Sequence, residues 1–209
     1  MELTWYGHSC FRMTERATLT VVTDPYEAKG DSLKLKADVV TVSRDDAQHN
    51  NVNAIVGAQR GDLRKITGPG EYEIGGVFIT GVAMKPDKKT EAPKTTVYAF
   101  NFDGLSVAHL GGLAFVPTQS QIDALETVNV LLVPIGGENE LNPAQASEII
   151  SMIEPSVVVP MGHGVKGNDN LAKFLKEMGL TNPKAQESLK ITKSQLPEDT
   201  QVVLLENKS

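Results

Sequence analysis

Three uninterrupted apolar runs restrict the fold of this chain more than any other feature. They cover residues 39–42, 130–135 and 157–161, and they are rich in valine and leucine. Short runs of this composition are typical of β-strands, and a strand that is apolar on both faces needs cover on both sides. The sequence therefore predicts buried sheets, which two packed sheets with helices outside them would provide.

The order of the predicted elements supports the same architecture. In the first half we expect strands over residues 1–6, 17–24, 37–43, 75–84, 95–102 and 104–110, with a hairpin turn at Asp103-Gly104. In the second half, helices over 117–127, 142–155 and 168–180 alternate with strands over 128–137, 156–164 and 200–206. Asn142 can cap the middle helix, Pro143 suits its first turn and Pro155 ends it. We expect an α/β (α+β) fold in a single domain spanning residues 1–209.

The composition excludes several classes of function. The 209 residues carry a formal net charge of −6, and no basic stripe is present that could follow phosphates, so we expect no nucleic acid partner. No apolar run approaches the roughly 20 residues that span a bilayer, so we expect no membrane association. The single cysteine, Cys10, cannot form an internal disulfide, and the chain shows no signal peptide. These features predict a cytoplasmic protein.

The four histidines of the chain are the first candidates for a functional site. His8, His49, His109 and His163 each lie beside a glycine or at the end of a predicted apolar strand. Polar groups at the ends of strands are where α/β sheets build their sites. A single histidine in such a setting is more often structural, but four of them favour a common site.

Seven stretches carry a resemblance to a known family. They read LTWYGHSCFRM, TDPY, VVTVSRDDAQHNNV, GPGEYEIGGVFITGV, DGLSVAHLGGL, VLLVPIGGENELNPAQA and IEPSVVVPM. In letters, order and spacing they resemble the metallo-β-lactamase superfamily, in the branch of small cytoplasmic hydrolases similar to ascorbate-6-phosphate lactonase. The resemblance covers nearly the whole chain and implies an αββα sandwich. We interpret the glycines and proline of GPGEYEIGG as a turn, with an oligomer surface as the alternative.

The resemblance also implies a metal site in one loop. Active relatives carry H-x-H-x-D-H after a strand, and these side chains hold one or two divalent metals, commonly Zn²⁺ or Mn²⁺. A metal lowers the pKa of bound water to about 7, which supplies a hydroxide to attack a lactone, an amide or a phosphoester. In this chain Arg44, Asp46, Gln48 and His49 stand at those positions. Only His49 is retained, and the guanidinium of Arg44 has no lone pair to offer a metal.

The other ligand positions that the resemblance implies are altered too. Pro86, Gly112 and Gly162 stand where relatives carry a histidine, a bridging aspartate and a histidine. His163 follows one residue late, which on an extended strand would turn it to the opposite face. We therefore expect no metal cofactor. The alternative is one divalent metal, Zn or Mn, held by Asp46, His49, His109 and His163.

Arg44 is the most informative of the altered residues. Its fixed charge can neutralise a buried acid such as Asp24 or Asp46, which would otherwise be costly to bury. The alternative is that it binds a small carboxylate or phosphate ligand. Asp45 or Asp46 can also cap a short helix that runs through His49. The vestigial pocket that we predict consists of Asp24, Arg44, Asp45, Asp46, Gln48, His49, His109 and His163.

The sequence thus predicts a hydrolase-like protein that has lost most of its metal ligands. We expect it to be catalytically inactive, with no residue assigned as catalytic, and to act in binding or regulation. Its partner is unknown, and a second copy of the chain is one candidate. The alternative is a divergent metal-dependent hydrolase of phosphoester, lactone or amide bonds that uses a single residual metal.

Overall fold

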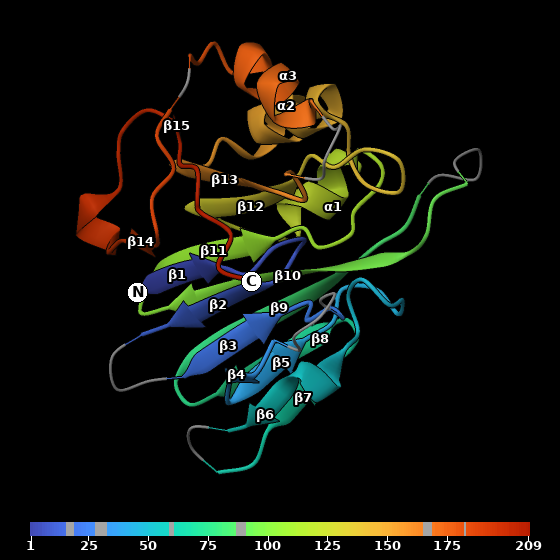
Figure 1. Cartoon of the computed structure of the whole chain (residues 1–209), viewed down its shortest axis with the longest axis vertical. Coiled ribbons are helices and arrows are strands. Elements are labelled where there is room, and N and C mark those ends of the chain that lie inside the picture. The colour runs from blue at the N-terminus through green and yellow to red at the C-terminus, as the bar shows by residue number, and fades with distance from the viewer. Residues whose placement is uncertain (16–18, 28–32, 59–60, 87–90, 165–168, 182) are drawn as a thin grey trace.

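Two β-sheets face each other in the computed structural model, which describes residues 1–15, 19–27, 33–58, 61–86, 91–164, 169–181 and 183–209 (Figure 1). The six-stranded sheet has the order β14 (Leu189–Lys190), β1 (Glu2–Trp5), β2 (Phe11–Thr14), β3 (Thr20–Thr23), β5 (Val39–Thr41), β7 (Arg64–Ile66). The seven-stranded sheet has the order β15 (Gln201–Val202), β13 (Val157–Met161), β12 (Val130–Pro134), β11 (Leu105–His109), β10 (Thr95–Phe102), β9 (Val77–Met84), β8 (Gly70–Ile74).

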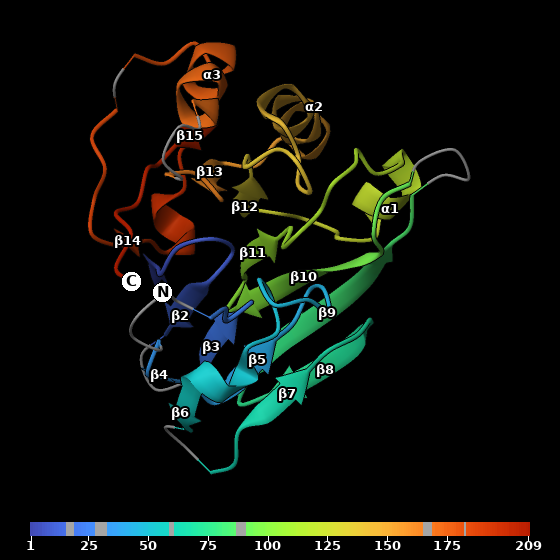
Figure 2. The same ribbon diagram turned by 45° about the vertical axis from the view of Figure 1, so that its right-hand side comes forward.

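Further layers cover the outer faces of both sheets. The helices α1 (Gln119–Asp123), α2 (Pro143–Ile153) and α3 (Asn170–Glu177) lie over the seven-stranded sheet (Figure 2). Over the six-stranded sheet, the described residues place a short 3-10 turn, η1 (Val52–Ala54), and the paired strands β4 (Leu35–Lys36) and β6 (Ile55–Gly57). The sandwich of two sheets is therefore confirmed, and its second outer layer is built mainly from extended chain.

The apolar strands are buried on both faces, as their composition predicts. Val21 and Val39 belong to the core between the two sheets, whereas Val22 and Val40 belong to the cluster beneath β4 and β6. All four side chains are 0% exposed. Successive residues of a strand point to opposite faces, so a run without polar residues serves two cores at once.

Local signals also act as the sequence predicts. The Asn142 side chain accepts a hydrogen bond from the N–H of Gln145 at 3.0 Å, the Gln145 side chain accepts one from the N–H of Asn142 at 3.0 Å, and Pro143 opens α2. This reciprocal pair satisfies two backbone donors that a helix start leaves free. The hairpin between β10 and β11 turns at Asp103 and Gly104, with φ angles of 51° and 80° that suit its tight turn.

Several of the observed elements differ from the expected ones. Residues 70–74, within the segment interpreted as a turn, form β8, the edge strand that pairs with β9. The last predicted strand is regular only over Gln201–Val202. Residues 17, 18 and 168, at the predicted starts of a strand and a helix, lie outside the described residues. A membrane-spanning helix is not found in the described part of the chain, since its helices are too short or too polar.

The two sheets bring several strand ends to one edge of the molecule. Strands β3 and β5 run parallel in one sheet, and β11, β12 and β13 run parallel in the other. The loops after β5 and after β13 are joined to other segments by backbone hydrogen bonds, from Thr96 N to the Ser43 carbonyl at 2.9 Å and from Gly162 N to the His8 carbonyl at 3.2 Å. The carboxyl ends of parallel strands are where such folds place their sites.

Candidate functional site

The segment after β5 folds as a turn and not as the short helix that the sequence predicted. The N–H of His49 donates to the carbonyl of Asp46 at 3.0 Å, and the N–H of Gln48 donates to Oδ1 of the Asp46 side chain at 3.0 Å. Aspartate side chains commonly close local turns in this way. The turn brings Asp46 and His49 into contact, whereas Asp45 is exposed and accepts a hydrogen bond from Asn50.

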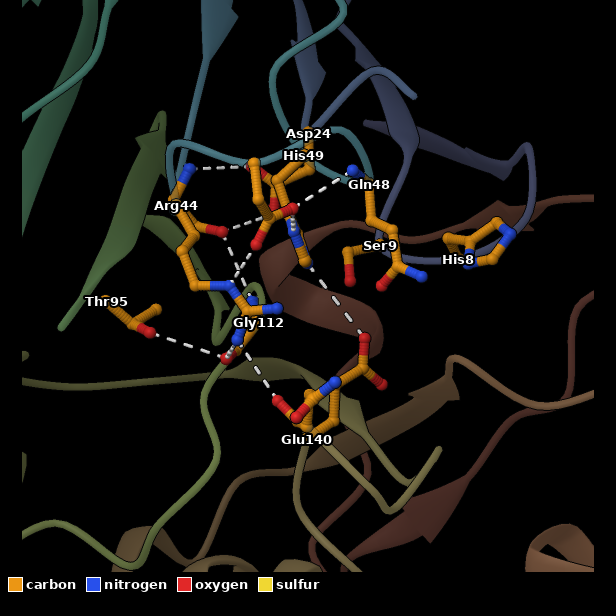
Figure 3. A network of polar contacts seen from close by, with 12 residues as sticks. His8, Ser9, Asp24, Arg44, Gln48, His49, Thr95, Gly112 and Glu140 are labelled. Carbon is orange, nitrogen blue, oxygen red and sulfur yellow. Dashed lines mark hydrogen bonds and ion pairs between the residues drawn. The ribbon is translucent and has the colours of Figure 1, made fainter. Parts of the chain in front are cut away.

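The side chain of Arg44 lies between three loops and is only 10% exposed. Its Nε pairs with Oδ2 of Asp46, and its Nη1 donates to the carbonyl oxygens of Gly112 at 2.9 Å and Asn139 at 3.1 Å (Figure 3). These partners follow β5, β11 and β12 along the chain. The expectation that Arg44 neutralises an acid is confirmed for Asp46, so this cation ties the strand-end loops together.

Asp46, His49 and Glu140 form a line of polar groups beside Arg44. Oδ1 of Asp46 lies 2.6 Å from Nδ1 of His49, and Nε2 of His49 lies 4.0 Å from Oε1 of Glu140 (Figure 3). An ionised carboxylate can only accept, so Nδ1 carries the proton of a neutral imidazole and the Nε2 lone pair faces Glu140. The side chains of His49 and Glu140 are 1% and 10% exposed, whereas that of Asp46 is 36% exposed, so bulk water reaches the line at its Asp46 end.

Three glycines leave room for this cluster. A Cβ at Gly112 would lie 2.7 Å from Nε2 of His49 and 3.1 Å from Cζ of Arg44. A Cβ at Gly162 would lie 2.5 Å from Oε2 of Glu140, and one at Gly136 would lie 2.6 Å from the same atom. The cluster therefore fills the space that larger residues at 112, 136 and 162 would need.

Asp24 lies beside the cluster but is satisfied in another way. Its carboxyl is fully buried and accepts from the N–H of Ser43 at 2.7 Å and from Oγ of Ser43 at 2.5 Å. Oγ of Ser43 in turn accepts from the N–H of Gly112 at 3.2 Å. Burial raises the pKa of Asp24 to about 8, although the bonds from Ser43 oppose that shift.

The acids and the imidazole of the cluster are shifted in different directions. Burial raises the pKa of Glu140 to about 7, with Arg44 acting against it. Burial also acts to raise the pKa of Asp46, but the bonds from His49 and Arg44 outweigh it and hold that pKa below its usual value. Burial lowers the pKa of His49, against the pull of Asp46. Near neutral pH the ion pair of Arg44 and Asp46 is thus the fixed charge of the site.

The remaining predicted residues lie apart from this cluster. Gln48 is exposed. His109 is fully buried with Nε2 2.8 Å from the carbonyl of Ser9, and burial lowers its pKa to about 3. His163 packs on Trp5 with ring centroids 4.6 Å apart. The four-residue metal set of Asp46, His49, His109 and His163 is therefore not assembled, and within the described residues no three His, Cys, Asp or Glu side chains are arranged to hold a metal.

Comparison with known proteins identifies the family. Residues 2–162 match the model described as the β-lactamase superfamily domain. This chain belongs to the β-lactamase superfamily. A crystal structure from Thermotoga maritima, of a protein described as a Zn-dependent hydrolase of the metallo-β-lactamase superfamily, is 30% identical with a TM-score of 0.77, covering 98% of this chain and 97% of that one.

Relatives in archaea agree with this assignment. The UPF0173 protein of Pyrococcus furiosus is 28% identical over 196 residues, covering 85% of this chain and 90% of the relative. A UPF0173 metal-dependent hydrolase of Methanoculleus marisnigri is 28% identical over 182 residues, covering 77% of this chain and 80% of the relative. The predicted resemblance and the metallo-β-lactamase type of fold are thus confirmed.

In this member of the metallo-β-lactamase superfamily, most of the positions at which we expected altered metal ligands border one cluster. Arg44, Asp46 and His49 form it, and Gly112 and Gly162 lie against it. The backbone at Gly162 has a φ of 72°, a left-handed conformation in which a histidine would be strained. The loop after β13 is therefore shaped for glycine and not for a ligand side chain.

Glu140 is the member of the cluster that the sequence did not predict. It follows β12 within PIGGENEL, part of a stretch that carried the resemblance, but no site residue was predicted there. The available signal was an acidic residue just after a Gly-Gly at the end of a buried strand. Glu140 fits into the cluster only because residues 136 and 162 are glycines. The spacing along the chain does not indicate that both glycines lie against its carboxyl group.

Proposed function

We propose that this chain is a metallo-β-lactamase-fold protein that has lost the metal chemistry of its family and acts by binding a partner or ligand. The observation that carries this proposal is the Arg44 guanidinium, which is 10% exposed and bonded to Asp46, to Gly112 and to Asn139. A cation that belongs to the protein is fixed where the family would place metal ligands.

Electrostatics oppose a divalent ion at this cluster. An ion of charge +2 at roughly 4 Å from the guanidinium would be repelled by about 8 kcal/mol at an effective dielectric constant of about 20. A guanidinium is not deprotonated in proteins, so loss of a proton cannot relieve this repulsion. The donor set is small as well, because Gly112 and Gly162 offer no side-chain ligand.

The residues present therefore do not fit the dinuclear centre of the family. Burial supports the same conclusion for catalysis, since the side chain of His49 is 1% exposed and a substrate could not reach it without movement of the loops. A binding or regulatory role needs neither metal nor access to His49. We propose such a role. A second copy of the chain is one candidate partner, and a measurement of the oligomeric state in solution tests that candidate.

A cavity beside Arg44 is the place where a small anionic ligand would bind. It has a volume of about 360 Å³ and is lined by Val42, Ser43, Arg44, Asp45, Asn50, Thr67, Lys94 and Thr96. A carboxylate or phosphate there would find hydroxyl and amide donors and the cation of Lys94, with the carboxylate of Asp45 acting against it. Wild type and Lys94→Ala can be compared for binding of inorganic phosphate and acetate by calorimetry, and equal binding by the two proteins would exclude this site.

The second candidate is a divergent metal-dependent hydrolase of phosphoester, lactone or amide bonds. Its support is that relatives such as the Methanoculleus marisnigri protein are named metal-dependent hydrolases, and that Nε2 of His49 faces the carboxyl of Glu140 at 4.0 Å. In this reading Glu140 replaces His109 and His163 as the partner of Asp46 and His49 around one metal.

Elemental analysis of protein purified without a histidine tag separates the two candidates. The binding protein is expected to carry Zn and Mn far below one equivalent per chain, and to leave phosphodiester and lactone probes uncleaved. Stoichiometric metal, together with cleavage that EDTA abolishes and added metal restores, would instead establish the hydrolase. A divalent-free preparation that is reloaded with Zn²⁺ or Mn²⁺ guards against loss of metal during purification.

A further inference from the structure

One side of the sandwich ends in two strands that have no further described strand beside them. β7 is the last strand of the six-stranded sheet, β8 is the last strand of the seven-stranded sheet, and they lie near each other (Figure 1, Figure 2). We infer that this β7–β8 edge binds a second copy of the chain, so that β7 of each copy pairs with β8 of the other. This inference rests on the proposed function, in which a second copy is one candidate partner.

The strand β7 turns open peptide groups away from its sheet. The N–H of Arg64 donates to the Asp38 carbonyl at 2.9 Å, and the Ile66 carbonyl accepts from the N–H of Val42 at 2.9 Å. Arg64 and Ile66 therefore face β5. Alternate residues of a strand in a parallel pair face the same neighbour, so the N–H and C=O of Lys65 point outwards. Such groups at a sheet edge are a template for another strand.

The strand β8 is open in the same way. It pairs with β9 through a two-residue turn at 75–76, whose φ angles are 57° and 80°. The residues that flank such a turn, Ile74 and Val77, form a hydrogen-bonded pair, and bonded and non-bonded pairs alternate from there along the ladder. The peptide groups of Glu71 and Glu73 therefore point away from β9. Both glutamates belong to GPGEYEIGG, for which an oligomer surface was the alternative prediction.

The two strands carry opposite charges on exposed side chains, which are Arg64 and Lys65 on β7 and Glu71 and Glu73 on β8. None of the four forms an ion pair with another described residue. Pairing β8 with β8 of a second copy would set glutamates against glutamates, and like charges on adjacent strands are unfavourable. Pairing β7 with β8 sets cations against carboxylates instead. Charge complementarity thus selects the pairing of unlike strands.

The strand directions allow this pairing in a closed dimer. β7 runs parallel to β5, towards the loops at the strand ends, and the connection 67–69 reverses the chain into β8, which runs back. Rotation of a second copy by 180° about an axis along this edge places its β8 against β7 and its β7 against β8, both antiparallel. The same contact forms twice, as the two-fold symmetry of common homodimers requires, and neither strand is left open for a third copy.

Exposed apolar side chains flank the same edge. Phe78, which is 58% exposed, lies on β9 directly opposite Glu73 of β8. Val56, which is 54% exposed, lies on β6, and the end of β6 and the start of β7 are bonded to the successive residues Ala37 and Asp38. In the dimer, the outer face that carries Phe78 adjoins the outer layer that carries Val56 in the other copy. The contact would therefore cover apolar surface that a single chain leaves in water.

Charge exchange tests the pairing by sedimentation velocity over a series of protein concentrations. Arg64→Glu/Lys65→Glu makes the whole edge acidic, and Glu71→Lys/Glu73→Lys makes it basic. We expect wild type to dimerise reversibly and each variant alone to dimerise at least about 10-fold more weakly, because like charges then face each other in both contacts. An equimolar mixture of the two variants should restore dimers, because each acidic strand then meets a basic one.

A control and three contrary outcomes complete the experiment. Lys173→Glu/Lys176→Glu changes the net charge equally on α3 and should dimerise as wild type does. A wild type that is monomeric at every concentration would overturn the inference, as would dimers that both edge variants keep or a mixture no stronger than its components. If a double variant does not fold, Lys65→Glu and Glu71→Lys replace the pair. Metal with EDTA-sensitive turnover in wild type would contradict the proposed function alone, whereas a metal-free monomer would contradict only this edge.

Discussion

Two neighbouring acids at the strand ends are accommodated by opposite means. Asp24 is enclosed by neutral donors from Ser43, and its pKa is raised to about 8, so near neutral pH the protonated form predominates. Asp46 is paired with the Arg44 guanidinium and with His49, and its pKa lies below the usual value. Asp24 avoids a charge by keeping its proton, whereas the charge of Asp46 is balanced by the guanidinium of Arg44. The contrast explains why the chain depends on Arg44 more than on any other side chain of the site.

Replacing Arg44 should have the largest effect. A fully buried pair that loses one partner costs about 3–5 kcal/mol, and the partial exposure of Asp46 reduces the value expected for Arg44→Ala to about 3 kcal/mol in the free energy of unfolding. Chemical denaturation measures it. Arg44→Lys is the matched control and should lose less, because the charge is kept while the contacts to Gly112 and Asn139 are weakened. Equal losses in the two variants would mean that geometry, not charge, sustains Asp46.

The pH dependence of stability should come next. The raised pKa of Asp24 means that the folded state keeps a proton that the unfolded state has released above about pH 4, so the unfolding free energy falls as pH rises towards 8. Between pH 6 and pH 8 the loss attributable to Asp24 is about 2 kcal/mol. Glu140, with its pKa raised to about 7, adds a decline of the same sign up to that pH.

Asp24→Asn isolates this contribution. Its amide cannot titrate, so from pH 6 to pH 8 the unfolding free energy of wild type should fall by about 2 kcal/mol relative to that of Asp24→Asn, measured by denaturation at each pH. The lowered pKa values of His49 and His109 act on both proteins with the opposite sign, so the difference between the two profiles isolates Asp24. Asp46 also has the opposite sign: its pKa is lowered, so its contribution is present above the unfolded pKa and is lost as pH falls below about 4. Parallel profiles of wild type and Asp24→Asn would contradict the assignment of Asp24 as a neutral acid.

Gly112→Ala tests the steric side of the cluster. The new Cβ would lie 2.7 Å from Nε2 of His49, and overpacking of this kind costs about 1–3 kcal/mol. Gly68→Ala is the matched control, because a Cβ there meets nothing within 4 Å and the backbone is not left-handed. Thermal unfolding of the two variants measures the difference. If Gly112→Ala lost no more stability than Gly68→Ala, the side chains of the cluster would be able to move aside for the new methyl group.

Much of the fold was predictable because its signals are local. Val21 and Val39 pack in one core, and Val22 and Val40 pack in another. Because such strands are buried on both faces, they appear in the sequence as unbroken apolar runs. The helix start at Asn142 is equally local. The edge strand β8 was not predicted, since the glycines and proline around it are also typical of a turn.

The contacts of the site were predictable only where both residues lie in the same loop. The pairing of Arg44 with Asp46 lies within three residues, and opposite charges so close along a turn indicate contact. Glu140 was missed because its position depends on Gly162 in the loop after β13 as well as on Gly136 in its own loop, and the contact with Gly162 is a long-range packing relation. His163 was assigned to the pocket by the family motif, but the chain reverses at Gly162 and the ring packs on Trp5.

The smallest effects are expected at two residues of the predicted pocket that the fold leaves outside the cluster. Asp45 and Gln48 are exposed, and Gln48 serves Asp46 through its backbone N–H, which any residue other than proline supplies. Asp45→Ala and Gln48→Ala should each change the free energy of unfolding by less than about 0.5 kcal/mol. Chemical denaturation of these two variants in parallel with Arg44→Ala measures the difference. If Gln48→Ala lost as much stability as Arg44→Ala, the Gln48 side chain would belong to the site after all. On the expected outcome, substitutions at neighbouring positions of one loop reduce the free energy of unfolding by amounts that differ several-fold. The reason is that burial and charge pairing, and not the place of a residue in the motif, determine how much its side chain contributes to stability.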